Sequence, residues 1–412
     1  MHRTSVDVNR KIIAGILLFA AIFVAYLNSF HVPFLFDDTE SVFGNGTLSD
    51  FLSFRWLAPP ADGTLAGRPV ANGTFALNMA LGGTGDFGFH VFNFLIHVAA
   101  TVVLFILLES IFSSLRTEAL REKSFELAWI CALIWGVHPL NTAAVTYISQ
   151  RTEELMGLFY ILVIYSYWRF QENPENRSWA LAAIASCFLG VGCKEEIATA
   201  PILVLLVDRT FHSGSFKEAL SRRKFLYTGL FASWLVVAFL WLSSTERRSG
   251  ISAGVRSYQY ALAESRVIIQ YLKLTVFPSP LVFDYALTPY RRYAEEIPFA
   301  VSIIVIGAVV AFLVYKRKSV GLLLAWFFLI LAPSSSFIPI AIQPMGENRV
   351  YLSSIGIIIL VVCSLYLALR KWSWAVFAII GCTLIYLTIN RNEDYRNADR
   401  IWTDTILSLI HI

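Results

Sequence analysis

Two adjacent acidic residues, Asp37 and Asp38, end the segment PFLFDD just after the first apolar stretch of the chain. A carboxylate that is partly desolvated beside aromatic rings has a raised pKa and can act as a general base. The second carboxylate could fix the first in place or help to bind a divalent cation such as Mg²⁺ or Mn²⁺. A solvated loop turn is the plainer interpretation, and the spacing alone does not separate these alternatives.

A second group of charges, Lys194, Glu195 and Glu196, fills a minimal turn between two short apolar segments. Ionisable residues at membrane depth are costly and are usually paired or functional. Lys194 could therefore bind a phosphate while one of the two carboxylates orients it. A structural Lys–Glu pair that closes the helical hairpin is the alternative.

Three arginines are further candidates for binding an anionic group. Arg349 follows Glu347 where the chain re-enters an apolar stretch, and it could grip a phosphate with two hydrogen bonds. Arg68 precedes a proline in a polar segment, where an arginine is more often a surface residue. Arg151 could equally form a screened helix-end pair with the acidic residues that follow it.

His138 precedes Pro139 inside an apolar stretch, which predicts a helix kink. It is a supporting candidate for the site, as is Tyr351, and a satisfied buried histidine is the alternative for His138. Asn45 and Asn72 each begin an N-x-T sequon, a pattern that chance easily produces. The five cysteines show no CxxC or zinc-ligand spacing, so neither a disulfide framework nor a zinc site is predicted.

The elements that must position these residues are apolar helices. The chain of 412 residues is 57% hydrophobic and only 15% charged, whereas soluble domains are about a quarter charged. We predict an all-α polytopic membrane protein with about eleven transmembrane helices, and nothing in the chain indicates a nucleic acid as partner. The predicted spans are 12–30, 88–112, 127–148, 155–170, 178–192, 197–211, 225–243, 297–315, 319–332, 350–370 and 372–390.

The charge pattern predicts the orientation of these spans. Placing the N-terminus in the cytoplasm puts the basic clusters 222–224 and 316–318 on the cytoplasmic side, as the positive-inside rule requires. The C-terminus is then outside, and the segment 258–277 is a helix in the outer interface. The predicted domain 1–390 carries outer loops at 31–87, 244–296 and 333–349, followed by a short outer tail, 391–412.

In this order the motifs resemble a known family. The chain resembles the GT-C glycosyltransferases that use polyprenyl-phosphate sugars, and within them the transmembrane, tetratricopeptide-repeat-containing O-mannosyltransferases and their bacterial relatives. The segments that carry the resemblance are FLFDD (34–38), GRPVANGTFALNMALGGTGDFGFHVFNFLIH (67–97), HPLNTAAVTYISQRTEELMGLFY (138–160), CKEEIATAPILVLLVDR (193–209), FPSPLVFDYAL (277–287), PSSSFIPIAIQPMGENRVYLSSIGI (333–357) and DYRNADRIWTDTI (394–406).

The resemblance implies an inverting sugar transfer at the outer face of the membrane. Asp37 or Asp38 would be the base on an acceptor hydroxyl of a protein, glycan or lipid, and the donor would be a polyprenyl-phosphate sugar. Lys194 and Arg349, with Arg68 or Arg151, would hold the leaving phosphate. The family also implies membrane lipids as surroundings and, by resemblance only, a bacterial inner membrane with the site on the periplasmic side.

Two departures from the family pattern stand out. Asn141 occupies a position where the family often has a second histidine. The repeats are missing as well, since the tail resembles only the lead-in to the first repeat, so repeats were truncated or a repeat-containing partner chain supplies them. A lipid-linked sugar flippase and a catalytically inactive assembly subunit remain alternatives to the enzyme.

Overall fold

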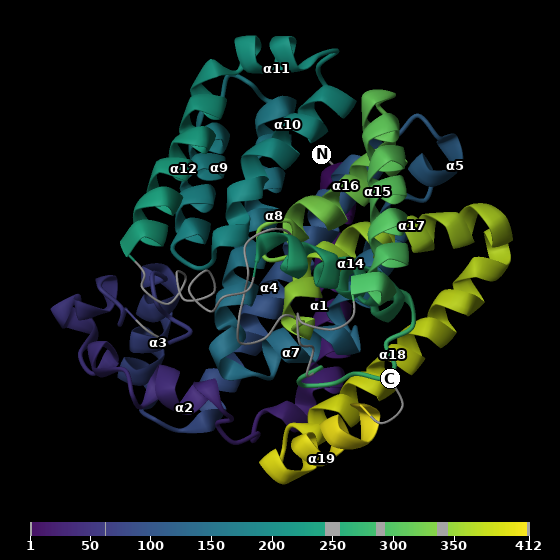
Figure 1. Ribbon diagram of the computed structural model, residues 1–412. Coiled ribbons are helices and arrows are strands. Elements are labelled where there is room, and N and C mark those ends of the chain that lie inside the picture. Colours follow the sequence, from purple (N-terminus) through teal and green to yellow (C-terminus); the bar gives the residue numbers. More distant parts are fainter. Residues whose placement is uncertain (1, 62, 244–255, 286–292, 336–344, 410–412) are drawn as a thin grey trace.

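The computed structural model describes residues 2–61, 63–243, 256–285, 293–335 and 345–409. Within these ranges every regular element is a helix (Figure 1), which confirms the predicted all-α class. Parts of the predicted outer loops 244–296 and 333–349 lie outside the described residues, as does the end of the tail. The α-helices are α1 (His2–Tyr26), α2 (Asp37–Val42), α3 (Pro69–Gly82), α4 (Asp86–Ser113), α5 (Glu118–Arg121), α6 (Ser124–Gly136), α7 (Thr142–Val145), α8 (Arg151–Glu172), α9 (Ser178–Val191), α10 (Ala200–Phe211), α11 (Phe216–Arg222), α12 (Lys224–Ser243), α14 (Ser257–Val276), α15 (Tyr293–Tyr315), α16 (Ser319–Leu331), α17 (Val350–Leu369), α18 (Ser373–Asp394) and α19 (Ala398–Leu409).

Several of these helices are long and apolar enough to cross a membrane. In the described part of the chain four stretches meet both criteria, and the number rises to six if each bent helix pair is counted as one span. A helix of 28 residues such as α4 is about 42 Å long, more than the roughly 30 Å of a hydrocarbon core. Helices α9 and α16 are apolar but shorter. The protein is therefore an integral membrane protein with several apolar helices, and every segment predicted as a span is mostly helical.

The predicted kink at His138 is confirmed. Helix α6 ends at Gly136, and the following pair Pro139–Val145 is inclined to it by 48°. A proline ring lacks an N–H donor and collides with the carbonyl four residues earlier, so it ends one helix and starts the next. The bend places 148–153 at the end of the bundle that also carries α2, α3 and α19, opposite α11 (Figure 1).

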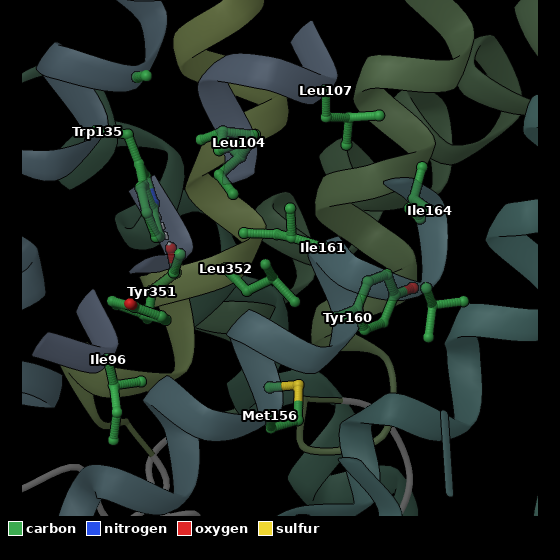
Figure 2. Close-up of a cluster of buried hydrophobic side chains, with 14 of the residues drawn as sticks. Ile96, Leu104, Leu107, Trp135, Met156, Tyr160, Ile161, Ile164, Tyr351 and Leu352 are labelled. Atoms are coloured by element: carbon green, nitrogen blue, oxygen red, sulfur yellow. Dashed lines mark hydrogen bonds between the residues drawn. The ribbon is translucent and has the colours of Figure 1, made fainter. Parts of the chain in front are cut away.

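A buried core holds α17 against the first half of the chain (Figure 2). Trp135 Nε1 donates a hydrogen bond of 2.8 Å to the carbonyl of Tyr351, and His97 bridges the Tyr351 hydroxyl and the carbonyl of Gly136 at 2.9 and 2.8 Å. A Cβ atom at Gly157 would lie 2.8 Å from the Tyr351 ring. Only glycine lets α8 approach α17 this closely.

The predicted outer loops contain helices of their own. Helix α14 matches the predicted helix at 258–277 and packs against α15 and α17. In the first loop Asn45 and Asn72 are buried and joined by a hydrogen bond of 2.8 Å, and Thr47 contacts both. In this structure these asparagines serve to close the loop and are not presented as acceptors of a glycan.

Candidate active site

The structure separates the two adjacent aspartates. Asp38 is 1% exposed, and its carboxylate oxygens accept hydrogen bonds from the main-chain N–H groups of Ser149 (2.6 Å) and Leu35 (3.1 Å). Asp37 begins α2 with an exposed side chain, and its main-chain N–H donates to the Tyr147 hydroxyl at 3.1 Å. Asp38 therefore fixes the loop to the 148–153 segment, and Asp37 is the exposed carboxylate of the pair.

Both carboxylates have raised pKa values, for one main reason. Burial raises the pKa of Asp38 to about 7, although hydrogen bonds from Leu35 and Ser149 partly offset it. Partial burial also raises the pKa of Asp37, and a hydrogen bond with Tyr147 opposes that rise. A carboxylate with a raised pKa is a stronger base once it is ionised, which suits Asp37 to proton abstraction.

Aromatic rings from three distant segments surround Asp37. The ring of Phe36 lies 4.8 Å from Phe283 and 5.1 Å from Trp402, measured between centroids. Tyr147 contacts Phe283 in turn, at 5.5 Å. The segment after α14 and helix α19 thus build a wall beside α2. The sequence motifs included these rings, but nothing local indicated that they meet.

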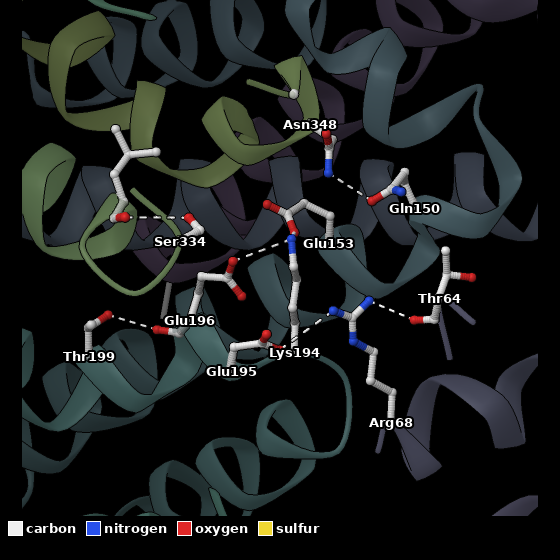
Figure 3. Close-up of polar contacts among 12 residues, drawn as sticks. Thr64, Arg68, Gln150, Glu153, Lys194, Glu195, Glu196, Thr199, Ser334 and Asn348 are labelled. Atoms are coloured by element: carbon white, nitrogen blue, oxygen red, sulfur yellow. Dashed lines mark hydrogen bonds and ion pairs between the residues drawn. The ribbon is translucent and has the colours of Figure 1, made fainter. Parts of the chain in front are cut away.

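Lys194 lies in a second, buried group of charges (Figure 3). Its ammonium group contacts the carboxylate of Glu153 and lies 3.4 Å from that of Glu196. Beside it, Arg68 lies 3.6 Å from Glu195 and donates a hydrogen bond of 2.7 Å to the carbonyl of Thr64. The structure thus places Lys194 near Arg68 and adds Glu153 as the main partner of Lys194.

The segment Glu347–Arg349 ties three parts of the chain together. The Glu347 carboxylate accepts hydrogen bonds from the Val282 N–H at 2.6 Å and the Tyr285 hydroxyl at 2.8 Å. Arg391 on α18 approaches the same carboxylate at 3.7 Å. Sequence reasoning missed Arg391, because no local motif connects it to Glu347, 44 residues earlier in the chain.

Arg349 is buried next to acidic and aromatic groups. Glu264 on α14 and Glu196 interact with it electrostatically. Burial raises the pKa of Glu264 to about 7, and the Arg349 charge opposes this rise. Neighbouring Asn348 donates a hydrogen bond of 2.8 Å to Gln150 (Figure 3). Arg349 therefore lies between α14 and the Lys194 group.

The segment 148–153 joins these groups. Its residues bind Asp38 through Ser149, Asn348 through Gln150, and Lys194 through Glu153. Four residues of helix advance by roughly 6 Å, so this short stretch holds the aspartates and the basic residues at one end of the bundle.

Two candidates occupy structural positions. The Arg151 guanidinium is fully buried and donates to Asn93 (2.7 Å), Asn78 (2.8 Å), and the carbonyls of Phe89 and Thr74. His138 is also buried and bridges the carbonyl of Thr275 (3.1 Å) and the N–H of Leu140 (3.3 Å). The satisfied buried histidine, one of the two alternatives for His138, is thus what the structure contains.

The two aspartates differ as candidate ligands of a metal ion. Both oxygens of Asp38 accept main-chain hydrogen bonds, which leaves Asp37 as the accessible ligand of the pair. Across the described ranges, no group of three or more His, Cys, Asp or Glu side chains could hold a metal ion.

Comparison of the sequence with known proteins finds distant relatives. The chain is 29% identical to protein O-mannosyl-transferase Tmtc1 of Drosophila melanogaster over 214 residues, which is 50% of the chain and 24% of that protein. It is 30% identical over 206 residues to Tmtc2 of the same organism (45% and 20%) and 27% identical over 195 residues to human TMTC4 (42% and 26%). No family model and no solved structure matches.

These matches confirm the resemblance to the O-mannosyltransferases, a GT-C family, as distant homology. The alignments span about a quarter or less of the length of the first two of these relatives.

Proposed function

We propose, with this distant homology to protein O-mannosyl-transferases as the premise, that the protein is a membrane glycosyltransferase. Its donor is a polyprenyl-phosphate sugar, and its acceptor is a hydroxyl group of a protein, glycan or lipid. The observation that carries the proposal is the exposed carboxylate of Asp37. The neighbouring, buried Asp38 anchors this segment to Ser149, at the end of the bundle that also holds Lys194 and Arg349.

In the proposed reaction Asp37 removes the proton from the acceptor hydroxyl. The acceptor oxygen then forms a bond to the anomeric carbon, and the bond from that carbon to the phosphate oxygen breaks with inversion. Polyprenyl phosphate leaves with the bonding electrons. General base catalysis of this kind contributes typically 10²–10⁴-fold in rate.

We propose that Lys194, Arg68 and Arg349 bind the leaving phosphate. Glu153 and Glu196 each engage the Lys194 ammonium, which within the described residues leaves one of its three N–H donors for a ligand. A preoriented cation stabilises charge that develops in the transition state without reorganising first. Arg151 positions the 148–153 segment in this proposal, because its guanidinium is already bonded to protein groups. Glu195, Glu347, Tyr351 and His138 likewise position neighbouring groups.

The remaining topology is part of the proposal. All eleven apolar segments cross the membrane, the shorter helices being shielded by their neighbours, and α14 lies in the outer interface. The N-terminus is cytoplasmic, and the site faces outward, on the periplasmic side of a bacterial inner membrane. Residues 1–390 are the transmembrane domain. The tail that follows packs its Tyr395 and Ile401 beside the site, where a repeat-containing partner could reach it.

The test is sugar transfer by the purified chain in detergent. Radiolabelled polyprenyl-phosphate hexoses are the donors and a cell-envelope extract is the acceptor. We expect transfer by the wild type, its loss in Asp37→Asn, and normal transfer in Glu40→Gln, an exposed carboxylate on the same helix. Equal donor binding by all three proteins without release of sugar would refute the enzyme and favour the transport or assembly role.

A further inference from the structure

An apolar cavity lies at the other end of the bundle from Asp37. It measures about 270 Å³ and is enclosed by α4, α8, α10, α16 and α17. Its walls are almost entirely apolar and include Leu107, Ile164, Trp326 and Ile359, two of which appear at the edge of the buried cluster (Figure 2). Its size is near the lower end of the range of about 300–1,000 Å³ typical of small-molecule sites.

The cavity and the candidate active site lie at opposite ends of the same helices. On α8 Glu153 belongs to the active site and Ile164 to the cavity. Along α17 Arg349 precedes the helix and Leu367 lines the cavity near its end. The helical rise from Arg349 to Leu367 is about 27 Å, close to the roughly 30 Å thickness of a hydrocarbon core. On α17 the cavity extends from Ile355 to Leu367, and its far end therefore lies towards the membrane leaflet away from Asp37.

The cavity opens to the surface of the bundle. Val320 on α16 is 43% exposed and Leu367 on α17 is 39% exposed, and both line the cavity. Between the apolar walls and the surface stand three exposed polar residues, Thr117, Ser319 and Ser364. An apolar cavity with a polar mouth at the depth of an interface is shaped for a lipid with a polar head group.

Basic residues outnumber acidic ones next to the mouth, where exposed Glu118 follows Thr117. Lys316, Arg317 and Lys318 are exposed and directly precede Ser319, and exposed Arg116 precedes Thr117. Lys318 is also the N-cap of α16, whose first turn contains no acidic residue. The free N–H groups of a helix N-terminus favour an anion, and here they add to three basic side chains of the same segment.

We propose that this cavity binds an anionic phospholipid from the leaflet opposite Asp37. One acyl chain occupies the cavity between α16 and α17. The phosphate lies at Lys318, Ser319 and Arg116, where the basic segment neutralises its charge. This inference does not depend on the proposed sugar transfer, since it uses other residues at the other end of the bundle.

The test measures lipid binding to the purified full chain by native mass spectrometry. Dioleoyl phosphatidylglycerol is compared with zwitterionic dioleoyl phosphatidylcholine and with undecaprenyl phosphate. A basic residue near an anionic head group contributes roughly fivefold in binding. In the triple variant Lys316→Gln, Arg317→Gln, Lys318→Gln, we expect the preference for phosphatidylglycerol over phosphatidylcholine to fall at least tenfold.

A matched control removes three basic residues elsewhere, in Lys217→Gln, Arg222→Gln, Lys224→Gln on and beside α11, and should keep the preference.

Ser364→Trp fills the mouth from an exposed position and should reduce binding of phosphatidylglycerol. Thr117→Trp repeats the test from another mouth residue if the first variant fails to fold. No preference in the wild type, or equal losses in both triple variants, would overturn the proposal. Undecaprenyl phosphate displacing phosphatidylglycerol from the wild type but not from Ser364→Trp would assign the cavity to an isoprenoid and also overturn it.

Discussion

Replacing the buried Asp38 should mainly lower stability, whereas replacing the exposed Asp37 should mainly lower activity. Asp38→Ala removes the acceptor for the buried N–H groups of Leu35 and Ser149. Each unsatisfied buried donor costs about 1–3 kcal/mol, so the free energy of unfolding should fall by about 2–6 kcal/mol. That is a large fraction of the roughly 5–15 kcal/mol that stabilises a folded protein.

Asp37→Asn should change activity and leave stability nearly intact. The side chain is exposed, and surface substitutions usually change stability by about 0.5 kcal/mol or less. Loss of the general base should lower the rate of sugar transfer by about 10²–10⁴-fold. Thermal unfolding in detergent and transfer from a labelled donor measure the two quantities, with Glu40→Gln as the control on the same helix. An unstable Asp37→Asn, or a stable and inactive Asp38→Ala, would refute the assignment of roles from burial.

The raised pKa of Asp38 adds a pH signature. Its folded pKa is about 7 and its unfolded pKa is about 3.9, so the folded state holds a proton that the unfolded state releases. The stability that this group contributes is complete below about pH 4 and is lost as the pH rises towards 7, by up to about 1.4 kcal/mol per unit. Asp38→Asn should flatten the dependence of the unfolding temperature on pH in this range. An unchanged slope would show that titration of Asp38 is not its source.

Three further predictions concern the surrounding groups. Lys194→Met leaves Glu153 buried without its cation, so the free energy of unfolding should fall by about 3–5 kcal/mol. Adding Glu153→Gln should restore much of the unfolding temperature, and a double variant as unstable as the single one would contradict this. Arg151→Lys loses the planar fork that bonds four protein groups, so stability should fall by about 2–5 kcal/mol with the donor KM unchanged; a raised KM without a stability loss would instead indicate phosphate binding. In Gly192→Ala the new Cβ would lie 2.4 Å from a methyl carbon of Val70, so overpacking should cost about 1–3 kcal/mol, and Val70→Ala should relieve it in the double variant.

Much of the framework follows from local patterns in the chain. Apolar stretches long enough to span a bilayer became helices, and the kink at Pro139 follows from a ring that cannot continue a helix. The polar motifs at Asp37, Lys194 and Glu347 marked the parts of the chain that the structure brings to one end of the bundle. These features depend on neighbours a few residues away, so sequence alone determines them.

Tertiary structure decided which of these residues is buried and which is exposed. Asp37 and Asp38 are equivalent in the sequence, but Asp38 is buried and binds the N–H of Ser149, 111 residues away. The sequence left Arg151 as either a phosphate-binding residue or part of a helix-end pair, whereas in the structure its guanidinium donates hydrogen bonds to Asn93 and Asn78. Burial and pairing of charge are set by residues that are distant along the chain and adjacent in space, and no local pattern encodes that adjacency.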